Sequence, residues 1–146
     1  MLRRISTIEF VVLGYVMYFA MTLFFSPSLF ENEQSNLYEA LLKLIPSQEA
    51  WVTTSIALAS VYVISMFIKH HFAAMIANTL GGAFSMMICI TYMFIYPNIG
   101  AGVFLFVSLG SFFQVYKESN RYEKQKSDTL RQEIKSKGEL NKYEDD

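Results

Sequence analysis

The sequence predicts an all-α, polytopic integral membrane protein with four transmembrane helices, an outer interfacial helix and a charged cytoplasmic tail. Of its 146 residues, 53% are hydrophobic and 17% are charged, whereas an ordinary soluble domain has about 25% charged residues. The stretch 70–116 contains no Asp, Glu, Lys or Arg. Because a soluble domain needs charged surface on every element, these apolar stretches indicate a membrane protein of one domain.

Four apolar segments form the predicted spans, at about 8–25, 50–68, 72–95 and 99–116. Each has close to the roughly 20 residues that cross about 30 Å of hydrocarbon, and in lipid only a helix satisfies every backbone group within one segment. Arg3 and Arg4 precede the first segment, as in a signal peptide. That segment exceeds an h-region of about 7–15 residues and lacks a small-residue cleavage site, so we interpret it as a retained anchor.

The distribution of Lys and Arg predicts the orientation. With four spans, eight basic residues near membrane ends fall on one side and only Lys43 on the other. The eight are Arg3, Arg4, Lys69, Lys117, Arg121, Lys124, Lys126 and Arg131. Because short cytoplasmic loops carry the excess of basic residues, both termini are expected in the cytoplasm. The predicted location is the cell membrane, with the bacterial inner membrane favoured.

Two segments outside the spans have helical patterns. Leu37, Leu41, Leu44 and Ile45 recur at helical spacing before Pro46, which predicts an amphipathic helix on the outer membrane surface. Residues 1–116 then form the transmembrane domain, and residues 117–146 the charged tail. The tail pairs opposite charges three or four residues apart, as solvated helices do. We expect it to continue the fourth span and then to fray.

Small side chains recur every four residues along the third predicted span. They are Ala73, Ala77, Gly81, Ser85 and Cys89, with Gly82 beside them. Small residues at this spacing let membrane helices approach closely. The favoured interpretation is packing against a neighbouring span of the same chain, and the alternative is self-association. Cys89 is the only cysteine, so it is expected to be a buried packing residue.

Polar residues in or near the spans are interpreted first as structural. Asn78 is expected to bond a hydroxyl on another helix, with these candidates: Thr53, Thr54, Ser60 and Ser65. Glu9 is expected at the membrane interface, paired with a cation such as Arg4. His70 and His71 mark a cytoplasmic turn and point in different directions, so they share no metal face. Trp51 is expected to anchor in the aromatic belt.

No signature of catalysis is present. The chain lacks a nucleophile elbow, a zinc-protease motif, a P-loop and paired intramembrane carboxylates. We therefore expect no enzyme, cofactor or metal site. The net charge of −1 offers no attraction for nucleic acid. The remaining partners are the lipid bilayer, further copies of the chain, or a larger membrane protein.

Small size, several spans joined by short turns, and a charged hydrophilic tail together resemble the phage holins. Holins are membrane proteins that release or activate lysis enzymes. The resemblance covers the whole chain at the level of architecture, and it implies permeabilisation of the membrane by self-association through the small-residue stripe. The alternative is an accessory or immunity-type protein that binds a larger membrane partner through its tail and outer helix. A second alternative is a dimeric transporter of small solutes.

Overall fold

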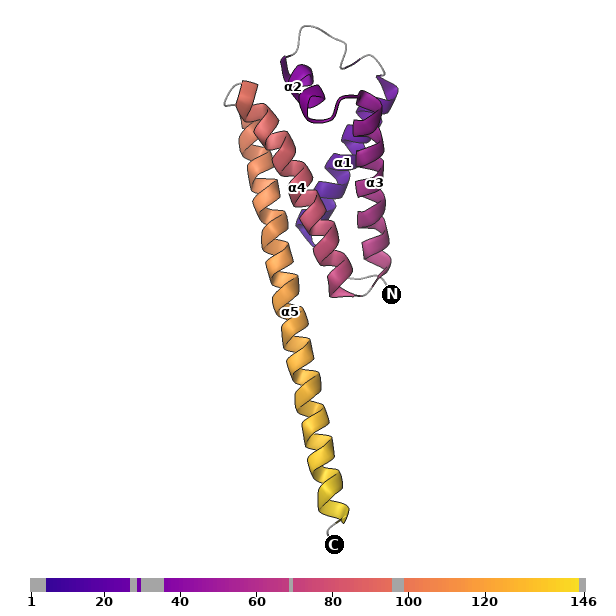
Figure 1. Ribbon diagram of the computed structural model, residues 1–146, viewed down its shortest axis with the longest axis vertical. Coiled ribbons are helices and arrows are strands. Elements are labelled where there is room, and N and C mark those ends of the chain that lie inside the picture. The colour runs from indigo at the N-terminus through magenta and orange to yellow at the C-terminus, as the bar shows by residue number, and fades with distance from the viewer. Residues whose placement is uncertain (1–4, 27–28, 30–35, 69, 96–98, 145–146) are drawn as a thin grey trace.

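The computed structural model describes residues 5–26, 29, 36–68, 70–95 and 99–144, and these contain helices and no strand. The elements are α1 (Thr7–Phe25), α2 (Asn36–Leu44), α3 (Gln48–Phe67), α4 (His71–Ile95) and α5 (Ile99–Glu144) (Figure 1). Four of them, α1, α3, α4 and α5, are long and apolar enough to cross a membrane. The prediction of an all-helical chain with four candidate spans is therefore confirmed.

Some predicted features lie outside the described residues. These are Arg3, Arg4, Lys69, the turn at 96–98 and the last two residues of the acidic end. The same holds for most of the connection between the first span and the outer helix, at 27–28 and 30–35.

The four long helices form two closely packed pairs. In the first pair, the Gln48 side chain at the start of α3 donates from Nε2 to the carbonyl oxygens of Leu23 on α1 and of Ser26 directly after it, both at 2.7 Å. In the second pair, Ser108 of α5 donates to the Gly82 carbonyl of α4 at 2.9 Å. Contacts between the pairs are fewer than contacts within them. We call the boundary between the α1–α3 pair and the α4–α5 pair the seam.

The surface of the bundle is apolar and its interior contains polar groups. Eight aromatic residues on the long helices are each at least 66% exposed: Phe10, Tyr18, Phe24, Phe25, Phe67, Phe94, Phe106 and Phe113. Among the residues whose burial the structure describes, ten polar or charged ones are buried: Glu9, Ser55, Ser65, Asn78, Ser85, Thr91, Ser108, Ser111, Gln114 and Glu118. Large exposed apolar surfaces are rare on soluble monomers, so this distribution fits a bundle surrounded by lipid.

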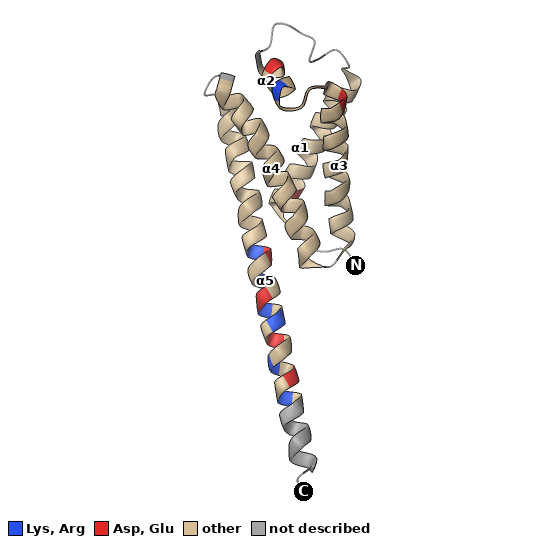
Figure 2. Ribbon diagram, viewed as in Figure 1, with Lys and Arg blue, Asp and Glu red and all other residues tan. Residues whose placement is uncertain are grey.

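α5 is much longer than a single span. Its 46 residues reach about 69 Å at 1.5 Å per residue, more than twice the roughly 30 Å of hydrocarbon. Charged side chains begin at Lys117, and the helix continues beyond the other four helices (Figure 2). The helix of the fourth span thus runs without interruption into the charged segment.

α2 lies over the end of the bundle opposite the projecting part of α5 (Figure 1). Leu41 is buried, and the Trp51 indole donates from Nε1 to the Leu41 carbonyl at 3.2 Å. Trp51 is itself fully buried, with its ring centroid 6.0 Å from that of Phe19 and 5.9 Å from that of Phe84. The prediction of Trp51 as an exposed belt anchor is therefore wrong, because its side chain faces the interior beneath α2.

Candidate functional site: the buried polar interior and the emergence of α5

A buried carboxylate joins the two helix pairs. Glu9 is 1% exposed, and its Oε1 accepts a hydrogen bond of 2.8 Å from Nδ2 of Asn78, which is fully buried. Its Oε2 accepts from the backbone amide of Ser6, also at 2.8 Å. Asn78 Nδ2 donates in addition to the Ala74 carbonyl within α4. The Glu9–Asn78 bond therefore crosses the seam from α1 to α4.

This arrangement corrects the predicted partner of Asn78. Asn78 does bond another helix, but its partner is a carboxylate on α1 rather than a hydroxyl on α3. The physical reason is that both side chains lie on the inward faces of their helices. Glu9 is buried inside the bundle, near the start of α1, and its predicted position at the membrane interface beside a cation stays a prediction. Arg4 and Lys69, the predicted cations, lie outside the described residues.

The small-residue stripe lies inside the chain. Ala77, Gly81, Gly82, Ser85 and Cys89 are buried, and Ala73 is half-buried. A Cβ at Gly81 would overlap the Tyr62 hydroxyl of α3, and one at Gly82 would lie 3.2 Å from the Phe112 ring of α5. Cys89 donates from Sγ to the Ala101 carbonyl of α5 at 3.2 Å. The chain's own helices thus cover the stripe, so another copy could not use the same face.

A second buried carboxylate marks the place where α5 leaves the bundle. Glu118 is 2% exposed. Its Oε2 accepts from Nδ1 of His71 at 2.6 Å, and its Oε1 accepts from Arg121 at 2.8 Å and from Gln114 at 3.3 Å. His71 is the first residue of α4. Glu118 therefore ties the start of α4 to α5 at the boundary between its apolar and charged parts.

Sequence reasoning missed this junction, although a signal was present. Ser108, Ser111, Gln114 and Glu118 follow one another at intervals of three or four residues, which places them on one face of a helix. All four are buried. A polar stripe within a lipid-spanning helix normally faces the interior of the bundle.

We expect Glu118→Ala to weaken the packing of α5 against the start of α4, because His71 and Arg121 would lose the carboxylate that both of them bond. Arg121 is half-exposed, so solvent screens its ion pair with Glu118. The expected loss of stability is therefore moderate. Amide hydrogen exchange at 114–121 should rise roughly tenfold, the equivalent of about 1.4 kcal/mol. Glu123→Ala, at an exposed position of the same helix, is the control. Equal exchange in the two variants would show that Glu118 does not hold the junction.

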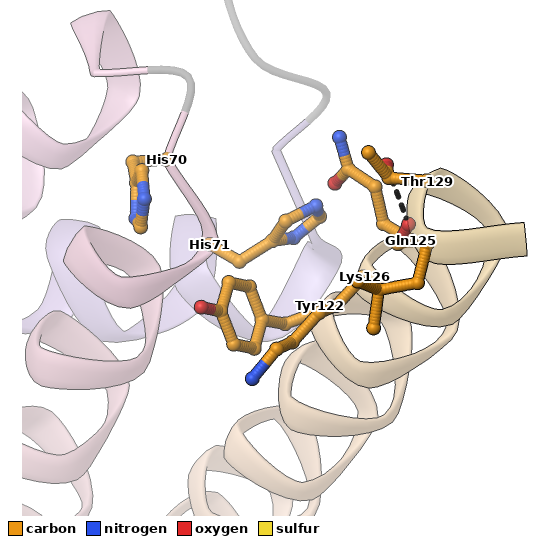
Figure 3. Close-up of a pocket in the computed structure, with 7 residues that line it drawn as sticks. His70, His71, Tyr122, Gln125, Lys126 and Thr129 are labelled. Atoms are coloured by element: carbon orange, nitrogen blue, oxygen red, sulfur yellow. Dashed lines mark hydrogen bonds between the residues drawn. The ribbon is translucent and has the colours of Figure 1, made fainter. Parts of the chain in front are cut away.

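A cleft of about 350 Å³ opens beside the junction. Its lining comes from the start of α4 and from α5: His70, His71, Tyr122, Gln125, Lys126, Thr129 and Leu130 (Figure 3). The His70 ring lies 6.3 Å from that of Tyr122, whereas His71 bonds Glu118. The two imidazoles therefore have separate neighbours and lie apart in Figure 3. The cleft combines cationic, aromatic and hydroxyl groups on the side of the projecting helix.

No protein-family model, curated protein or solved structure matches this chain. Its function therefore has to be inferred from its own geometry.

Proposed function

We propose that this chain is a non-enzymatic membrane protein that anchors a projecting helix and presents it to a larger membrane protein. One observation carries the proposal: α5 is continuous, yet every residue from 121 to 136 is exposed. Helices in proteins owe most of their stability to packing of one face. A long helix held at a defined angle by Glu118 and left unpacked beyond it is suited to docking.

The proposed orientation has both termini in the cytoplasm and α2 outside. The start of α1, the α3–α4 turn and the projecting half of α5 all lie at the same end of the bundle (Figure 1). The helix α2, which contains Lys43, lies at the opposite end (Figure 1). This grouping supports the orientation, because basic residues concentrate on the cytoplasmic side.

The proposed contact surface is one face of α5 that combines aromatic, basic and apolar side chains. Tyr122, Lys126, Leu130 and Ile134 are spaced four residues apart, and Leu130 and Ile134 are 49% and 71% exposed. The stripe begins in the cleft beside His70. A partner helix would place apolar side chains against Leu130 and Ile134 and a carboxylate near Lys126.

Site-specific photocrosslinking tests this function in the bacterial cell membrane. A photoreactive residue in place of Gln125, which lines the cleft, should give one discrete product with a protein larger than the chain. The control is the same residue in place of Ser127, which is exposed but does not line the cleft. Truncation after Thr129 keeps the photoreactive position but removes Leu130 and Ile134, so it should greatly reduce the product while the bundle still inserts. Products of equal yield from both positions would contradict a specific docking face.

Membrane permeabilisation of the holin kind is the second candidate. The observation in its favour is the set of polar groups buried along the bundle interior. Self-association would need a face other than the small-residue stripe, and the groove between α1 and α3 beside Ala20, Ala59 and Ser60 is one such face. Induced expression distinguishes the two functions. Collapse of culture density with uptake of an impermeant dye supports permeabilisation, and an intact membrane with confirmed insertion supports helix presentation.

A further inference from the structure

Four buried polar atoms inside the bundle make no hydrogen bond of good geometry with the residues that the structure describes, although the Ser111 side chain of α5 is within reach of one of them, the Tyr62 hydroxyl. They are Ser55 Oγ, Tyr62 OH, Asn78 Oδ1 and Ser85 Oγ. Each belongs to a side chain that is at most 1% exposed. A buried polar group without a partner costs about 1–3 kcal/mol, so four of them in one small bundle require an explanation.

The four atoms lie at two depths along the antiparallel helices α3 and α4. Tyr62 is five residues before the end of α3, and Asn78 is seven residues after the start of α4. Ser55 and Ser85 each lie seven residues, or two helical turns, deeper. The α3–α4 boundary belongs to the seam, where packing between helices is least extensive. The Glu9–Asn78 bond also crosses the seam, at the depth of the first two atoms.

Aromatic rings fill the interior on the side toward α2. Phe19, Trp51 and Phe84 lie edge to face in one cluster, with ring centroids 5.9–6.1 Å apart. Trp51 is one turn beyond Ser55, and Phe84 is next to Ser85. We call these three residues the aromatic plug. Ser55 is seven residues from the start of α3 and Ser85 is fourteen residues from the start of α4, so both lie near the middle of the bundle. The polar groups thus run from the side of the α3–α4 turn to the middle of the bundle, where the aromatic plug begins.

We propose that this polar part of the bundle interior binds a file of water molecules, from the Glu9–Asn78 bond to Ser55 and Ser85, closed toward α2 by the aromatic plug. A buried water molecule makes about three hydrogen bonds to polar groups that otherwise lack partners. The hydroxyls of Tyr62, Ser55 and Ser85 and the amide oxygen of Asn78 provide such groups at both depths. An apolar constriction excludes water and so acts as a gate. The bundle is therefore a half-channel that stays sealed while the plug is in place.

Accessibility of introduced thiols to Ag⁺ tests the water file, because this ion is small and reaches thiols only through water. The test uses the full chain in membrane vesicles, with Cys89→Ala as the background. Ser85→Cys introduces a thiol into the proposed file. Ser108→Cys is the matched control, since Ser108 is equally buried but bonded to Gly82 within the α4–α5 pair. Block of later maleimide labelling in detergent measures the reaction.

We expect Ag⁺ to block Ser85→Cys at least about tenfold faster than Ser108→Cys. Ile90→Cys, on the partly exposed apolar side of α4, should be as slow as Ser108→Cys. Equal rates at all three positions would overturn the water file. Ser55→Cys provides an independent second position on α3 in case Ser85→Cys fails to insert, and the same comparison applies to it.

Removal of the aromatic plug tests the gate. Phe84→Ala should raise the proton leak of proteoliposomes, measured with an internal pH-sensitive dye, by at least about tenfold. Leu23→Ala is the control, because it truncates another buried core residue that is not part of the plug. If Phe84→Ala is no longer monodisperse in detergent, the same measurement is made on Phe84→Leu. A leak that is unchanged in both Phe84 variants, or equally raised by Leu23→Ala, would contradict a gate at this position.

Discussion

Gly81→Ala is expected to destabilise the bundle by about 3 kcal/mol, at the upper end of the usual cost of overpacking. The new Cβ would overlap the Tyr62 hydroxyl and lie 2.9 Å from Tyr62 Cζ. Tyr62 is fully buried, so its rigid ring can move away only by displacing the groups packed around it. In detergent, the temperature at which the monodisperse species is lost should fall by roughly 10 °C.

Gly14→Ala is the matched control, because no atom lies within 4 Å of a Cβ at that position. Alanine is a better helix former than glycine by about 1 kcal/mol, so this variant should be neutral or slightly more stable. Tyr62→Phe in the Gly81→Ala background should restore part of the loss, since it removes the overlapping hydroxyl. Equal stability of the Gly81 and Gly14 variants would show that α3 and α4 do not approach in this way.

Asn78→Leu is expected to cost about 3 kcal/mol, because it leaves the buried Glu9 carboxylate without its hydrogen-bond donor on α4. The wild-type bond joins residues 69 positions apart in the chain and crosses the seam. Its loss should therefore weaken the association of the two helix pairs more than the individual helices. Unfolding in a denaturing detergent, followed by tryptophan fluorescence of the buried Trp51, measures the change.

Thr79→Leu is the control for this second prediction, since Thr79 is exposed and its hydroxyl bonds the Met75 carbonyl of its own helix. The double variant Glu9→Leu/Asn78→Leu should lose less stability than the sum of the two single variants, because removing both partners leaves no orphaned group. The expected coupling is about 1.5 kcal/mol or more. Additive losses would mean that the bond does not couple α1 to α4.

The Gly81 and Asn78 predictions bear on a choice that the sequence left open. A stripe of small residues every four positions favours packing within one chain, but it also allows self-association. The structure places Gly81 against α3 and Gly82 against α5, so substitution of Gly81 should damage the fold of a single chain. Loss of activity in a Gly81 variant therefore does not distinguish a pore from an accessory protein, whereas truncation of α5 does.

The sequence by itself determined the helical class and the number of candidate spans, and it placed both ends of the first three spans and the start of the fourth within about two residues of the observed helix ends. These properties are local, because the length and hydropathy of each segment decide whether it can satisfy its backbone in lipid. The amphipathic pattern ended by Pro46 likewise predicted a helix, and the structure has α2 there. Within the polar sites, Asn78 was identified as a residue that must bond another helix.

Only the tertiary structure decided which polar groups meet. Glu9 and Asn78 are 69 residues apart, and His71 and Glu118 are 47 apart. Such contacts depend on how helices are paired and rotated, and no short-range pattern records that information. Trp51 shows the same limit: its place near a span end predicts an exposed anchor, but α2 covers that end and the ring is buried. Any apolar face of a helix can lie against lipid, so hydropathy alone does not determine which face points inward. The inward face is determined by the buried polar groups and by the small residues that let the helices approach.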